Sequence, residues 1–176
     1  SMFNNAISFN SDLSNWNVSN IENMASMFLG AGSFNGDIGD WDVSNVENMG
    51  RMFSGAISFN QDLDSWTVTS VTEMYEMFSG ATSFDQDLSS WDVSGVTDMG
   101  GMFKEASSFN GDIENWDVKD VIYMDEMFFK AFAFDQNLGD WSIGAVDNME
   151  MMLDSSGLSL VNYDHTLAGW AGQTNA

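Results

Sequence analysis

Residues 37–60 read DIGDWDVSNVENMGRMFSGAISFN, and versions of this stretch follow one another every 25 residues along almost the whole chain. Methionine and phenylalanine keep the same 25-residue step. Tryptophan occupies one position of each repeat, at Trp16, Trp41, Trp66, Trp91, Trp116 and Trp141. A fixed period of this length is typical of a solenoid, in which each unit buries its apolar face against its neighbours.

Within one repeat, the pattern predicts a strand followed by a short helix. Residues 38–43 resemble a short strand with one buried face, because apolar and polar side chains alternate towards its end. Ser44 followed by Glu47 fits a capping box at a helix start. Apolar residues then recur at helical spacing, at Val46, Met49, Met52 and Ala56. Glycines suit helix ends in the left-handed conformation, at Gly30, Gly55 and Gly80.

Residues 88–110 show the repeat clearly, as L-x-x-W-x-V-x-x-V-x-x-M-x-x-M-F-x-x-A-x-x-F-N. This pattern resembles the BspA-type leucine-rich repeats of bacterial surface proteins, and specifically the DUF285 or surface-protein 26-residue repeat group. The resemblance covers residues 2–152. It implies an α/β fold, a right-handed leucine-rich-repeat solenoid with a parallel sheet on one face and short helices on the other. It also implies a secreted or surface-anchored protein, often an adhesive one.

The repeats divide the chain into two parts. Residues 1–152 hold about six tandem repeats, of which the first is truncated, and the opening in mid-repeat indicates a fragment of a longer protein. The phase breaks after Leu153, so residues 153–176 are expected to form a C-terminal cap. Within it, Asn162 is expected to cap a short helix that ends at Gly172 and carries one apolar stripe of Tyr163, Leu167 and Trp170. The N-terminal end lacks such a cap, so we expect either end-to-end self-association through residues 1–18 or fraying there.

Charge narrows the range of partners. Four basic residues stand against 27 acidic ones, giving a net charge of −23. Nucleic acid and anionic membranes are disfavoured, because binding phosphate needs a cationic face. No apolar run approaches the length needed for membrane insertion, and the absence of cysteine leaves the redox compartment undetermined.

The tryptophan column has two interpretations. If the tryptophan side chains are exposed, they would form a ladder on which carbohydrate could stack. If they are buried, they would fill the core. We favour the core, because an exposed ladder would leave the interior short of bulk. The paired methionine columns are likewise interpreted as flexible core filler and not as metal ligands.

An aspartate column suggests either a metal or a turn. It consists of Asp12, Asp37, Asp62, Asp87 and Asp112. Carboxylates stacked about 5 Å apart repel one another by roughly 1 kcal/mol in water. Calcium ions shared between repeats would offset this repulsion, and so would backbone N–H groups donating to each carboxylate within its own turn. Asn137 ends the column and favours the turn, although calcium remains a possible cofactor.

The polar side chains between the inward-facing strand residues form the expected ligand-binding face. A merely solvated sheet face is the alternative. The candidate binding residues are Asp40, Asp42, Thr67, Thr69, Asp92, Asn115 and Asp117. Repeat proteins commonly bind ligands on such a face.

Catalysis is not expected. His165 is the single histidine and lies outside the repeats, and the chain contains no phosphate loop and no zinc-type spacing. The sequence therefore predicts a non-catalytic extracellular or cell-surface recognition or adhesion module for a protein or glycan ligand. A structural spacer of a larger surface protein and a calcium-dependent binding module are the alternatives.

Overall fold

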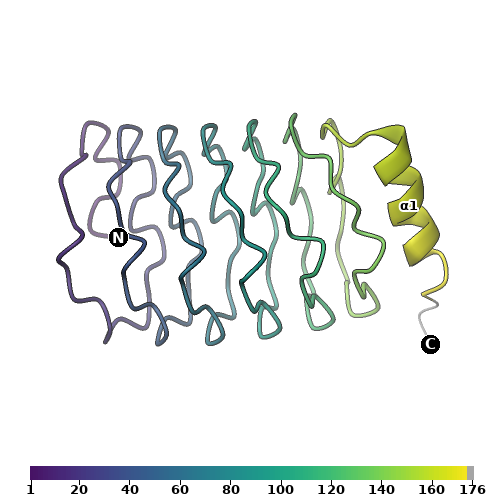
Figure 1. The fold of residues 1–176 in the computed structure, drawn as a ribbon, viewed down its shortest axis with the longest axis horizontal. Coiled ribbons are helices and arrows are strands. Elements are labelled where there is room, and N and C mark those ends of the chain that lie inside the picture. Colours follow the sequence, from purple (N-terminus) through teal and green to yellow (C-terminus); the bar gives the residue numbers. More distant parts are fainter. Residues whose placement is uncertain (174–176) are drawn as a thin grey trace.

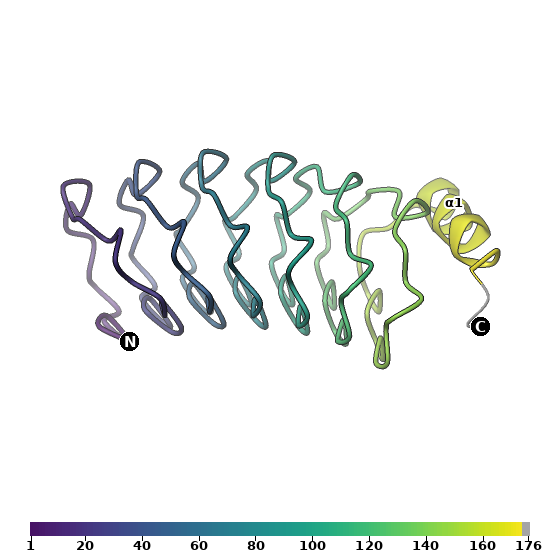
Figure 2. The same cartoon turned by 90° about the horizontal axis from the view of Figure 1, so that it is seen from below.

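The computed structural model describes residues 1–173, in which the chain winds into a row of stacked coils, one for every 25 residues (Figures 1 and 2). Within that range the one helix is α1, Leu160–Trp170, which lies against the last coil. No helix among the described residues is long and apolar enough to cross a membrane.

The predicted strands and repeat helices are absent from residues 1–159, so the expected leucine-rich-repeat solenoid with a parallel sheet is wrong. Adjacent coils are joined instead by backbone hydrogen bonds outside any strand, such as that from Phe28 N to Met52 O at 2.9 Å. Isolated parallel bridges connect them in the series Asn23–Asn48–Glu73–Asp98–Tyr123–Asn148. Each coil is a sequence of turns joined by short extended links. Turns and single bridges therefore replace the expected sheet.

Hydrogen bonds explain why no strand forms. Within a coil, N–H groups donate to the carbonyl three residues earlier, as Trp41 does to Ile38 (3.1 Å) and Val46 to Val43 (2.9 Å). Ser44, expected to begin a helix, donates its Oγ to Asp42 Oδ1 at 2.6 Å. Short polar side chains compete in this way with regular secondary structure.

Left-handed residues explain why no helix forms in the repeats. Gly55 has a φ of 70°, and Gly30 and Gly80 are also left-handed, as expected. Glu105, Lys130 and Ser155 hold the same left-handed position in the later coils. A second left-handed position lies four residues before each of these six residues. It is occupied by Ser26, Arg51, Glu76, Gly101, Glu126 and Met151. Two reversals of φ in every coil interrupt any right-handed helix.

The core runs through the centre of the stack. Phenylalanines pack in columns, with the rings of Phe28 and Phe53 5.6 Å apart and those of Phe28 and Phe34 4.0 Å apart. Five tryptophans are at most 4% exposed, namely Trp41, Trp66, Trp91, Trp116 and Trp141. Most residues of the methionine columns are also buried. The interpretation of both columns as core is confirmed.

Polar side chains tie adjacent coils together. Each buried tryptophan donates its indole N–H to a carbonyl of the preceding coil, as Trp66 does to Ile38 at 3.1 Å. A second ladder uses amide side chains: Asn35 Oδ1 accepts from Asn60 N at 2.9 Å, and Asn60 Oδ1 accepts from Asp85 N at 2.9 Å. These side-chain bonds add to the backbone hydrogen bonds between adjacent coils, such as that from Ser26 N to Gly50 O at 2.9 Å.

Helix α1 closes the C-terminal end of the stack. Ser159, not Asn162, is its N-cap, and its side chain accepts from Asn162 N at 3.3 Å. Trp170 continues the tryptophan ladder by donating to Leu138 O at 2.8 Å. The helix was expected to end at Gly172 but ends at Trp170. Residues 174–176 of the expected cap lie outside the described residues.

Candidate functional site

The expected binding residues are only partly brought together. Asp40, Asp42 and Thr67 line a shallow hollow of about 290 Å³, whose other lining residues include Gly39 and Ser65. The remaining candidates are exposed but lie outside this hollow, namely Thr69, Asp92, Asn115 and Asp117. The expected face is therefore solvated, with one hollow on it.

Several carboxylates of this face are engaged in their own turns. Hydrogen bonds from the Ser44 side chain and backbone hold the pKa of Asp42 below its usual range. Ser94 lowers the pKa of Asp92 in the same way. Lys119 lowers the pKa of Asp117 through hydrogen bonds from its ammonium and its backbone N–H. These carboxylates are charged at neutral pH, but one oxygen of each accepts a backbone hydrogen bond within its own turn.

The aspartate column has the turn geometry. Each Oδ1 accepts a hydrogen bond from the backbone N–H two residues later, in the pairs Asp12–Ser14 (2.9 Å), Asp37–Gly39 (3.1 Å), Asp62–Asp64 (2.9 Å), Asp87–Ser89 (2.8 Å) and Asp112–Glu114 (3.1 Å). Asn137 accepts from Gly139 N at 3.0 Å in the same manner. Residues 1–173 contain no cluster of three or more acidic, histidine or cysteine side chains arranged to hold a metal ion. These hydrogen bonds confirm the structural role of the column.

A second hollow, of about 330 Å³, lies where three coils meet, and the consensus of the repeat did not predict it. We call it the acidic groove, and its lining consists of Tyr75, Glu76, Asp98, Gly100, Gly101, Tyr123, Asp125 and Glu126. A Cβ on Gly100 would lie 3.2 Å from Asp125 Oδ1 and 3.3 Å from Asp98 Oδ1. A Cβ on Gly101 would lie 3.1 Å from Glu76 Cγ. The glycine pair thus leaves space between larger side chains of the coils on either side.

The charges of the acidic groove are only partly compensated. Glu76 pairs with Arg51 at 2.7 Å and Glu126 with Lys104 at 2.5 Å. Asp98 and Asp125 have no cationic partner within 4.0 Å among residues 1–173. Burial raises the pKa of Asp98, and repulsion from Asp125 and Glu76 adds to this effect, whereas a hydrogen bond from Gly100 N at 2.9 Å opposes it. The groove therefore presents two uncompensated carboxyl groups beside two tyrosine rings.

Departures from the repeat are the sequence signal for this groove. Tyr75 occupies a position that Gly50 and Gly100 hold in other repeats, and a Cβ on Gly50 would lie 2.2 Å from the Tyr75 ring. Tyr123 occupies a position that is otherwise asparagine or acidic, as at Asn48 and Asp98. These exchanges are not needed for the core, which makes them candidates for a function.

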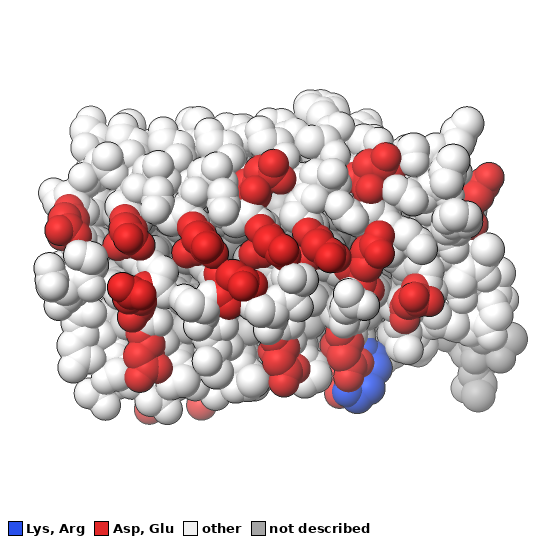
Figure 3. All heavy atoms as spheres, viewed as in Figure 1, with Lys and Arg blue, Asp and Glu red and all other residues white. Residues whose placement is uncertain are grey.

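Acidic side chains are not confined to the acidic groove. Acidic side chains form a row along the length of the face shown in Figure 3. All four basic side chains lie in ion pairs, namely Arg51–Glu76, Lys104–Glu126, Lys119–Asp117 and Lys130–Glu105. The described surface thus lacks any cationic region free of acidic partners.

Comparison with known proteins relates the chain to a protein family. Residues 1–87 and 61–170 match the family described as Mycoplasma protein of unknown function, DUF285. Neither a curated protein nor a solved structure matched the chain. Because the two matched segments together extend from residue 1 to residue 170, the chain belongs to the DUF285 family.

Proposed function

We propose that this chain is a non-catalytic recognition module that binds a cationic segment of a partner protein in the acidic groove. The observation that carries the proposal is the juxtaposition of Asp98 and Asp125, which lack cationic partners in residues 1–173, with two tyrosines in one hollow. An arginine or lysine side chain fits this chemistry. Its charge would offset the repulsion between the carboxylates, and its cation would contact the ring of Tyr123, because Arg51 already lies over the ring of Tyr75, 5.2 Å from the centroid.

The overall charge supports the same class of partner. With a net charge of −23, the molecule attracts cationic surfaces and repels anionic ones. Such a field raises the rate of association, whereas the contacts in the hollow decide which segment stays bound. Arginine suits the hollow better than lysine, because a planar guanidinium can stack on tyrosine and pair with a carboxylate at once.

The setting proposed for this binding is a cell surface. The support is the resemblance of the repeats to BspA-type surface proteins, in which such arrays are often adhesive. Adhesion would then consist of capturing basic segments of proteins outside the cell. The acidic surface in Figure 3 suits that role.

Isothermal titration with an octaarginine peptide tests the contribution of the groove. Tyr123→Ala removes a ring that lines the acidic groove and is 44% exposed. Tyr163→Ala is the matched control, because Tyr163 lies on α1, outside the groove, and is 42% exposed. We expect Tyr123→Ala to weaken binding about fivefold, a loss of about 1 kcal/mol, and Tyr163→Ala to leave it unchanged. Equal effects of the two substitutions would contradict the proposal.

A further inference from the structure

Two asparagines of the amide ladder between coils are followed by glycine, in Asn35-Gly36 and Asn110-Gly111. The other residues of the same column are followed by serine or glutamine, namely Asn10, Asn60, Asp85 and Asp135. The backbone nitrogen after an asparagine can attack the side-chain amide, and glycine has no side chain that would hinder this approach. Such an attack is therefore sterically easiest at these two positions.

The ladder polarises both amides. Each side-chain oxygen accepts two hydrogen bonds from the next coil, one from a backbone N–H and one from a glutamine amide. The donors are Asn60 N (2.9 Å) and Gln61 Nε2 (3.0 Å) for Asn35 Oδ1, and Asp135 N (2.8 Å) and Gln136 Nε2 (3.0 Å) for Asn110 Oδ1. Two N–H groups on one carbonyl oxygen stabilise the negative charge that the oxygen gains when a nucleophile attacks the carbon, as in an oxyanion hole.

The two nitrogens that take part in the attack are not held by the fold. Gly36 N and Gly111 N donate no hydrogen bond to an acceptor in residues 1–173. The side-chain Nδ2 groups of Asn35 and Asn110 have no acceptor among these residues either. The fold therefore fixes the oxygen and leaves the nucleophile and the leaving group free.

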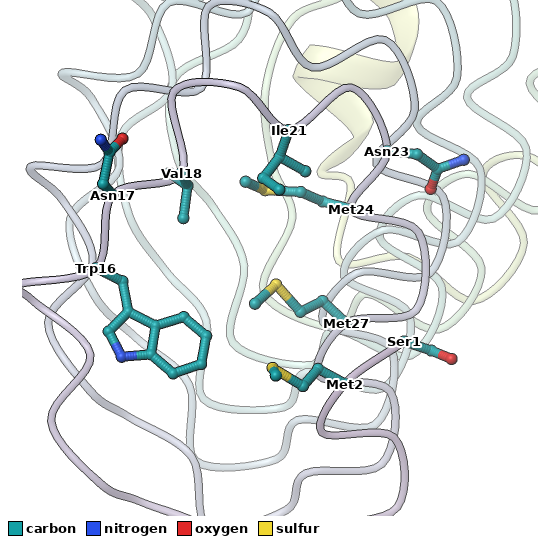
Figure 4. Close-up of a pocket in the computed structure, with 9 residues that line it drawn as sticks. All are labelled: Ser1, Met2, Trp16, Asn17, Val18, Ile21, Asn23, Met24 and Met27. Carbon is teal, nitrogen blue, oxygen red and sulfur yellow. The ribbon is translucent and has the colours of Figure 1, made fainter.

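Solvent reaches these amides, because the asparagines of the turns lie outside the apolar interior. At the first coil, Figure 4 shows Trp16 and Met24 pointing into an apolar hollow, whereas Asn17 points away from it. Asn35 and Asn110 are also exposed. Water and hydroxide, the co-reactants of amide hydrolysis, are thus available at both positions.

From this arrangement we propose that Asn35 and Asn110 are sites of spontaneous deamidation, promoted by the hydrogen-bond donors of the next coil. Hydroxide takes the proton of the glycine N–H, and the nitrogen forms a bond to Cγ of the asparagine. The electron pair of the C=O bond moves to Oδ1, where the two donors stabilise it. The bond from Cγ to Nδ2 then breaks, and Nδ2 takes a proton from water and leaves as ammonia. The product is a cyclic succinimide.

Water opens the succinimide at either carbonyl. Attack at the side-chain carbonyl gives aspartate, which keeps an acceptor at the ladder position, as Asp85 already does for Asn110 N at 2.9 Å. Attack at the backbone carbonyl gives isoaspartate, which has an additional carbon atom in the main chain and a shorter side chain. Isoaspartate therefore displaces the acceptor and weakens the joint between two coils, whereas aspartate preserves it.

Peptide mass spectrometry of the aged, folded protein tests this proposal. Ageing in water enriched in the heavy oxygen isotope, followed by digestion in ordinary water, separates deamidation of the folded protein from deamidation during digestion. Gln61→Met removes one donor to Asn35 and keeps a side chain of similar length. We expect it to slow deamidation at Asn35 about threefold to tenfold, the equivalent of one hydrogen bond. Deamidation at Asn110 of the same molecule should be unchanged, which also verifies that the fold is kept.

Gln86→Met is the matched control. It removes the equivalent donor, at 2.8 Å, from Asn60 and should leave the rate at Asn35 unchanged. In the parent, Asn60 should react more slowly than Asn35, because Asn60 is followed by glutamine although its side-chain oxygen also accepts two hydrogen bonds.

Two results would overturn the proposal. One is an equal rate at Asn35 in the parent and in Gln61→Met, because the donors of the next coil would then not promote the reaction. The other is a faster reaction at Asn35 in the urea-unfolded parent than in the folded parent, because the fold would then protect the amide.

Discussion

The indole N–H of Trp91 donates a hydrogen bond to the carbonyl oxygen of Leu63 in the preceding coil, at 3.0 Å. Trp91 is also 3% exposed, and its ring lies parallel to that of Trp66 at 6.4 Å. One side chain therefore fills the core and fixes the spacing between two coils. This side-chain bond adds to the backbone hydrogen bonds that join adjacent coils, such as that from Phe78 N to Met102 O at 2.8 Å.

Replacing Trp91 tests that dual role. Trp91→Ala should lower the free energy of unfolding by about 3–5 kcal/mol, because it removes a large buried aromatic. Trp91→Phe keeps most of the bulk but removes the hydrogen bond to Leu63 O, which still accepts from Trp66 N at 3.0 Å, so the loss should be smaller, about 0.5–1.5 kcal/mol. Urea unfolding measures both. Trp16→Ala is the control, because this exposed ring makes no such bond, and a loss as large as that of Trp91→Ala would refute the assignment.

Left-handed residues other than glycine should be sites of strain. Ser155 has a φ of 59° in the column that Gly30 and Gly55 also occupy. Ser155→Gly should raise the free energy of unfolding by about 0.5–1 kcal/mol, because glycine adopts this conformation without steric cost. Ser89→Gly should have the opposite sign, since Ser89 is not left-handed and glycine only adds disorder to the unfolded chain. Thermal unfolding of the two variants gives the comparison, and a shared sign would contradict it.

Stability should tolerate the loss of charge from the aspartate column, but not the loss of the side-chain oxygen that accepts the backbone hydrogen bond. Asp62→Asn keeps the hydrogen bond from Asp64 N and should leave stability almost unchanged. Asp62→Ala removes the acceptor and should cost about 1 kcal/mol. The melting temperature of the parent should be the same in calcium and in EDTA. A rise of several degrees with calcium would restore the metal-binding alternative.

Asp98 should make stability depend on pH. Its pKa is raised in the folded state, so folding favours the protonated carboxyl. The folded state is therefore favoured below the unfolded pKa and loses that advantage as pH rises through the folded pKa. Asp98→Asn should stabilise the protein at pH 7 by on the order of 0.5 kcal/mol, since solvent screens a group that is only partly buried. The gain should vanish below pH 3, and a gain independent of pH would contradict this origin.

The sequence predicted the core better than the backbone. Burial of Trp41, Met49 and Phe59 follows from their apolar character and common period, and the structure confirms it. The predicted helix failed because Ser44 and Glu47 satisfy a capping pattern, whereas Ser44 actually completes a turn with Asp42. The same short-range chemistry suits both structures, so the pattern alone could not separate them.

The left-handed backbone and the groove were harder to predict. Gly55 signalled its positive φ, but Arg51 and Glu76 adopt the same region without being glycine, which no local rule anticipates. The acidic groove arises from Tyr75, Gly100 and other departures from the consensus. The sequence prediction was based on the residues that the repeats have in common, and it therefore did not include residues that differ from the consensus.

The affinity for octaarginine of two charge-matched double variants tests the central claim most directly. Asp98→Asn with Asp125→Asn removes two charges from the acidic groove, and Asp40→Asn with Asp42→Asn removes two from the hollow on the originally expected face. At 0.15 M salt, where distant charges are screened beyond about 8 Å, the groove pair should weaken binding about tenfold, whereas the other pair should change it less than twofold. Equal losses would mean non-specific attraction to an acidic stack, and undetectable binding by the parent would favour a structural spacer; either result would contradict the proposed function.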